Sequence, residues 1–164
     1  MPMTHRQWGI KHGFGVLEIL IASAVISTAF ISLFFVFVLS QRAVLNASEK
    51  VRANFIAEEG LEVMRHLRDK SWSANLAPLA PGTLYYLSFD AGSSAWSTTI
   101  SNPGLIDGVF ERTVSVAAVM RDGADDIVDS GGIVDPDTLK IIVTTTWEGR
   151  SVGAETYLTN LFAN

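Results

Sequence analysis

The sequence predicts an α+β protein in which one long N-terminal helix packs on a small antiparallel sheet. Three observations support this class. An uninterrupted apolar run lies near the N-terminus, an amphipathic stretch without a helix breaker continues it, and alternating strand-like runs fill the second half. The 164 residues are enough for one modest domain plus an extension.

The apolar run covers residues 14–39, and Glu18 is its only charged residue. About 20 such residues cross a bilayer as a helix. A secretory signal peptide is the alternative, but its apolar core is normally about 7–15 residues and ends at small residues of the A-x-A kind. No such cleavage site occurs before Gln41. The length therefore favours a retained membrane helix.

Charge is distributed unevenly along the chain. Residues 1–13 contain Arg6 and Lys11 and no acid, whereas residues 71–164 contain eleven acids and four bases, a net charge of −7. By the positive-inside rule, we expect a single-pass protein of the cytoplasmic membrane with its N-terminus in the cytoplasm and its C-terminal part exported. The acidic C-terminal part argues against direct nucleic-acid binding.

The amphipathic stretch covers residues 40–70. It contains no proline, and Gly60 is its only glycine. Apolar residues recur at helical spacing and charged residues occupy the remaining positions. We predict one continuous helix from about Phe14 to Asp69, roughly 80 Å long at 1.5 Å per residue.

The residues after Lys70, 71–164, are expected to form a β-rich head. Trp72 and the Pro78–Gly82 cluster end the helix. Glu148–Arg150 reads as the turn of a hairpin between the last two strands. The predicted strands are residues 83–89, 109–120, 139–147 and 152–162. Alternation places Phe110, Arg112, Val114, Val116 and Ala118 on one face of the second strand, and Trp147, on the alternating third strand, is expected in the core.

An acidic, glycine-bearing loop is predicted from Arg121 to Asp137. Loops rich in oxygen ligands and glycine are typical of calcium sites. The spacing of the acids does not match an EF-hand, so a calcium site and a solvated turn both remain possible interpretations. The candidate ligands are Asp122, Asp125, Asp126 and Asp129.

Catalytic motifs are missing from the sequence. It contains no HExxH, GxSxG, P-loop or GxGxxG pattern, and no cysteine for thiol chemistry. Glu58, Glu59 and Glu62 could form a paired-carboxylate site, but a solvated helix face near a subunit interface is the simpler interpretation. We therefore do not expect an enzyme and expect no cofactor other than the calcium considered above.

The start of the apolar run has a specific pattern. Gly13 directly precedes Phe14, and Glu18 follows four residues later, ahead of the uninterrupted apolar stretch. Residues 1–40 closely resemble the class III signal of type IV prepilins and of type II secretion pseudopilins. Two positions depart from the family pattern: Gly15 stands where the family commonly has threonine, and Phe35 stands where major pilins commonly have a helix-breaking proline.

The resemblance implies a sequence of processing and assembly steps. A prepilin peptidase would cleave after Gly13, the new amino group of Phe14 would be methylated, and the subunit would join other pilin subunits in a pilus or pseudopilus. Glu18 would then pair with the N-terminus of a neighbouring subunit, because either charge alone is costly among apolar helices. The two departures suggest a minor, divergent member of the family.

Two other interpretations compete with a filament subunit. Glu18 could simply extend to water from the cytoplasmic end of a membrane helix. The protein would then be a single-pass anchor carrying an exported head that binds a ligand or metal. The third possibility, an exported enzyme, has no catalytic constellation among residues 14–164.

Overall fold

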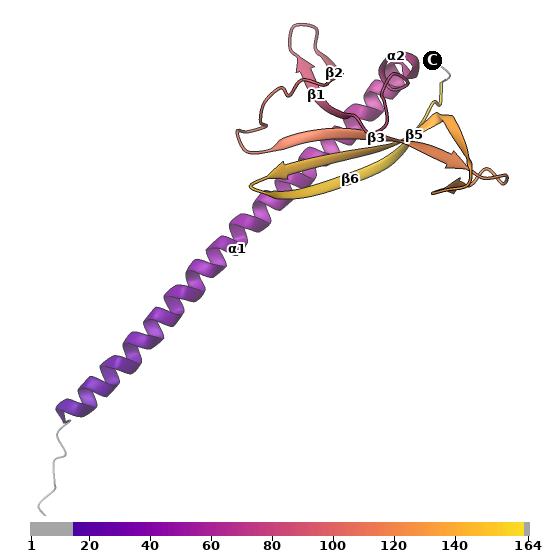
Figure 1. Cartoon of the computed structure of the whole chain (residues 1–164). Helices are drawn as coiled ribbons and strands as arrows, with labels where there is room; N and C mark the ends of the chain where they lie inside the picture. Colours follow the sequence, from indigo (N-terminus) through magenta and orange to yellow (C-terminus); the bar gives the residue numbers. More distant parts are fainter. Residues whose placement is uncertain (1–14, 163–164) are drawn as a thin grey trace, which may run out of the picture. The chain divides into compact units, whose positions relative to one another are not determined.

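The structure, a computed structural model, describes residues 15–162 (Figure 1). It divides into two compact units, with the boundary between Asn46 and Ala47. The first unit contains the N-terminal part of helix α1, and the second contains the C-terminal part of α1 and all the strands. We refer to the second unit as the head.

Helix α1 runs from Val16 to Lys70 and confirms the predicted continuous helix. It begins where the Gly15 carbonyl accepts hydrogen bonds from the amides of Glu18 and Ile19. Without an internal proline, no backbone donor is lost along its 55 residues. Immediately after it, Ser71 caps a four-residue helix, α2 (Trp72–Asn75), by accepting a hydrogen bond from the Ala74 amide.

The head contains one antiparallel sheet of six strands in the order β2-β1-β3-β5-β6, with β4 paired to β3. This arrangement confirms the α+β class, and Figure 1 shows the sheet beside the C-terminal part of α1. The strands are β1 (Leu84–Asp90), β2 (Ala95–Thr99), β3 (Glu111–Arg121), β4 (Ile127–Val128), β5 (Ile133–Trp147) and β6 (Arg150–Thr159).

The predicted hairpin joins β5 and β6. Their pairing is continuous from Trp147↔Arg150 to Thr138↔Thr159. The two turn residues, Glu148 (φ 45°) and Gly149 (φ 74°), both adopt the left-handed conformation. A two-residue turn with positive φ at both positions matches the twist of the flanking strands.

The sequence-based prediction was wrong for part of the Arg121–Asp137 loop. Residues 127–128 form β4, and residues 133–137 belong to β5. Strand β2 was also not predicted. Aspartate, glycine and proline mask the strand pattern here, and Pro136 is tolerated inside β5 because the β3–β5 register shifts at this point.

The hydrophobic core lies between the C-terminal part of α1 and one face of the sheet. Helix residues such as Leu61, Met64 and Leu67 pack with Val114 and Ile141. Each fully buried aliphatic side chain contributes about 1.5–3 kcal/mol relative to exposure. A second cluster at the start of the head contains Ala53, Ile56, Phe110 and Trp147.

Gly60 marks the closest approach of the helix to the sheet. A Cβ at this position would lie 2.7 Å from Val143 Cγ1 and 3.0 Å from Arg112 Cδ. The absence of a side chain therefore lets α1 lie directly on β5. The alternation predicted for residues 110–116 is confirmed, since Phe110, Arg112, Val114 and Val116 are all buried; Ala118, placed on the same face, is exposed because the register shifts after it.

Candidate functional site

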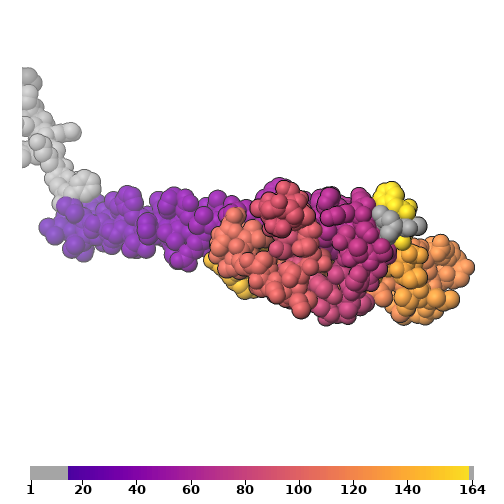
Figure 2. Space-filling view, turned by 90° about the horizontal axis from the view of Figure 1, so that it is seen from above, coloured from indigo at the N-terminus to yellow at the C-terminus, as the bar shows by residue number. Residues whose placement is uncertain are grey.

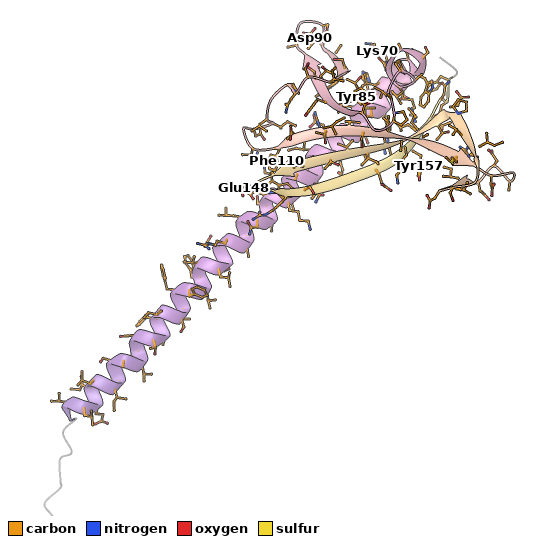
Figure 3. All side chains as sticks on the ribbon, viewed as in Figure 1. Lys70, Tyr85, Asp90, Phe110, Glu148 and Tyr157 are labelled. Carbon is orange, nitrogen blue, oxygen red and sulfur yellow. The ribbon has the colours of Figure 1, made fainter. Side chains whose placement is uncertain are left out.

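The apolar part of α1 is exposed on all sides within its own unit. Large side chains from Val16 to Leu39 are at least 55% exposed, except that of Val38, which is partly exposed, and Figure 3 shows side chains projecting around the helix. One helix of the described residues, α1, is long and apolar enough to cross a membrane. So large an apolar surface is unstable in water and requires a covering of lipid or protein.

The four hydroxyl groups in this segment are satisfied inside the helix. Ser23 and Thr28 donate to carbonyls three residues earlier, and Ser27 and Ser32 to carbonyls four residues earlier, at 2.7–2.9 Å. Such bonds remove the cost of placing hydroxyls among apolar groups. They leave Glu18 as the one polar group of the segment that requires an outside partner.

Glu18 lies in the first turn of α1. A carboxylate is favoured there by the partial positive charge of the helix N-terminus. Its side chain is exposed, and no basic side chain of residues 15–162 pairs with it. The other two residues of the predicted processing site, Gly13 and Phe14, lie outside the described residues.

Arg112 is a buried charged residue of the head whose contacts we did not predict. Its side chain is only 5% exposed and lies between the sheet and α1, 3.1 Å from the Glu59 carboxylate. It also donates to the Ile56 carbonyl and lies 5.5 Å from the centre of the Trp96 ring. The sequence signal was available, since arginine occupied an inward-facing position of an alternating strand. Arg112 thus links the helix to two strands.

We predict that Glu59→Gln lowers the free energy of unfolding by about 1–2 kcal/mol. The substitution leaves the buried Arg112 guanidinium without its carboxylate, and the half-exposed position of Glu59 limits the loss. Glu62→Gln is the matched control, because Glu62 pairs with Arg65 at an exposed position of the same helix. Urea unfolding of the two variants measures the difference, and equal stabilities would contradict a clamping role for Arg112.

The candidate calcium ligands do not come together. Asp122 accepts hydrogen bonds from the amides of Ala124 and Asp126, which fixes the turn. Asp125 has a positive φ of 68° and lies beside Arg121. Within residues 15–162, no group of three or more acidic or histidine side chains is placed to hold a metal ion. Asp122, Asp125, Asp126 and Asp129 therefore provide no metal site in this structure.

Arg121 provides the positive charge of this acidic region. Its Nε donates to Asp135 Oδ2 at 2.7 Å, and its Nη1 donates to the Asp125 carbonyl at 2.8 Å. The Arg121 hydrogen bond, with a second from Thr138, lowers the pKa of Asp135 below its ordinary value. The Arg121 guanidinium thus neutralises part of the negative charge that had suggested a calcium site.

The lowered pKa of Asp135 predicts a pH dependence. A carboxyl group with a lower pKa in the folded state stabilises the fold above its unfolded pKa of about 3.9, and this contribution disappears as pH falls through the folded pKa. We expect Asp135→Asn to melt below the wild type at pH 6, and the gap to close near pH 2. Asp126→Asn, at an exposed position without a side-chain ion pair among the described residues, is the control. A gap that is unchanged at pH 2 would contradict the assignment.

Comparisons with protein-family models, with curated proteins and with solved structures found no match for this chain. The interpretation of its function therefore depends on its own residues and geometry.

Proposed function

We propose that the protein is a structural subunit of a type IV pilus or pseudopilus. The observation that carries the proposal is an exposed apolar helix segment that contains one carboxylate, Glu18, and continues into a β-rich head; no basic side chain of residues 15–162 pairs with this carboxylate. The Gly13–Phe14 junction in the sequence supplies the processing signal that such a subunit requires.

In the proposed filament, the exposed apolar helix and Glu18 each have a function in assembly. Before assembly, lipid covers the apolar part of α1, since about 20 residues match the hydrocarbon thickness of about 30 Å. In the filament, helices of neighbouring subunits replace the lipid. Glu18 then pairs with the ammonium group of Phe14 on a neighbour, which sets the register of packing more than its strength.

The partners follow from the proposal: a prepilin peptidase, the cytoplasmic membrane, and further pilin subunits of the same or another kind. The subunit itself carries out no chemical reaction. The second candidate, a single-pass anchor with a ligand-binding head, is favoured by the same exposed helix and differs in leaving residues 1–13 attached.

Processing distinguishes the two candidates. We expect co-expression with a prepilin peptidase to shorten the chain by residues 1–13, as measured by intact mass. Gly13→Leu should block the cut, whereas Glu18→Ala should still permit it. A wild-type chain that keeps residues 1–13 in the presence of an active peptidase would favour the anchored-head candidate.

A further inference from the structure

One end of the head is a three-stranded arm, consisting of residues 119–121 of β3, all of β4, and residues 133–135 of β5. The arm, coloured orange, lies at one end of the head in Figures 1 and 2. The β3–β5 register shifts at its base, where Ala118 pairs with Leu139 but Val119 pairs with Asp135. Residues 136–138 therefore have no partner on β3, and the regular ladder is interrupted between the arm and the main sheet.

The arm has little hydrophobic core of its own. Val119 is buried, but Ile127, Ile133 and Val134 are 42%, 83% and 52% exposed. In contrast, the main sheet buries an inward-facing residue at almost every second position of β3 and β5. Segments with few buried apolar contacts open at lower free energy than the core to which they are attached.

The Arg121 side chain adds contacts to the backbone pairs of the arm and reaches across the interruption. Arg121 on β3 donates to Asp135 on β5, to the Asp125 carbonyl before β4, and, at 3.5 Å, to Thr138 Oγ1. Thr138 is buried, pairs with Thr159 of β6, and so belongs to the main sheet. The guanidinium thus joins β5 to the loop that leads into β4 and connects both to the main sheet.

We propose that the arm is a latched flap whose three strands separate cooperatively from one another while the main sheet stays folded, with the Arg121 side chain as the latch. Opening of the flap changes a groove on the surface of the head. Ile127, Val128 and Asp129 form one wall of a groove floored by Ala117 and Ala118, and Lys140 and Tyr157 form the other. Tyr157 is labelled in Figure 3, on β6 near the arm. When the flap opens, the groove loses the β4 wall and the strand β3 loses its neighbour. This inference concerns the head alone and holds whether or not the subunit enters a filament.

Hydrogen exchange of the full chain in detergent micelles, followed by mass spectrometry, tests the flap. In the wild type, amides of residues 119–121 and 133–135 should exchange at least about tenfold faster than those paired between residues 111–117 and 140–146. Arg121→Gln should accelerate the arm by a further factor of about ten or more, since it removes charge-assisted hydrogen bonds, and leave the main sheet unchanged.

Two further variants make the result decisive. Gly132→Ala should accelerate the same amides while keeping the Arg121 guanidinium, because a Cβ there would lie 2.5 Å from the Arg121 carbonyl oxygen and 2.8 Å from Val128 Cγ2. Arg52→Gln, which breaks the exposed pair with Asp107 elsewhere on the head, should leave the arm unaffected. Equal acceleration of the arm and the main sheet in Arg121→Gln, or no acceleration of the arm, would overturn the proposal.

Discussion

Replacing Glu18 with alanine should abolish filament formation while leaving the protein in the membrane and open to processing. In the proposed filament, the variant leaves the Phe14 ammonium group of each neighbour unpaired among apolar helices. A single unpaired charge in such surroundings costs about 2.5–3.5 kcal/mol, which corresponds to a loss of roughly 100-fold at each subunit addition. Counting sheared filaments by electron microscopy measures the effect.

The control for this experiment is another exposed acid on the same helix. Asp69 lies near the C-terminal end of α1 and pairs with Arg68, so Asp69→Ala should assemble normally. Both variants should reach the membrane at the wild-type level. Normal filament numbers from Glu18→Ala would refute the charge pair and leave Glu18 as a residue that simply extends to water.

The second large effect is expected in the head, where Gly60→Val should lower the free energy of unfolding by about 2–3 kcal/mol. The new side chain would overlap Val143 and the aliphatic part of Arg112, both of which are buried. Overpacking of a tight core typically costs about 1–3 kcal/mol, and valine adds little intrinsic helix propensity to offset it. Denaturant unfolding of the full chain in micelles measures the loss.

Two variants isolate the steric cause. Gly123→Val introduces the same side chain where nothing lies within 4 Å of the new Cβ, and it should change stability by less than about 0.5 kcal/mol. Val143→Ala should make Gly60→Ala less costly than it is in the wild type, because the nearest methyl group has been removed. Additive effects of the last two substitutions would show that helix and sheet do not meet at Gly60.

The sequence was sufficient to predict the helix and the central strands, because their patterns are local. Residues 19–39 are apolar or small without a charge, and residues 40–70 lack a helix breaker, so the sequence predicted a single helix. Strands β3, β5 and β6 alternate clearly over their central residues. The inward positions of Phe110, Val114 and Trp147 followed from that alternation and are confirmed by their burial.

What the sequence could not predict depends on contacts between distant residues. Strand β4 has two residues and exists because Met120 and Arg121 pair with it. The acids of the Arg121–Asp137 segment looked like calcium ligands because their spacing did not reveal that Arg121 would lie among them. The Glu59–Arg112 pair joins residues far apart in the chain, and only the packing of α1 on β3 brings them together.

The most direct test of the proposed function is the N-terminal residue of the protein in purified surface filaments. We predict a chain that begins at Phe14, with a mass that corresponds to the loss of residues 1–13 and the gain of one methyl group. A filament fraction that lacks the protein, while the membrane retains a full-length chain beginning at Met1, would contradict the account.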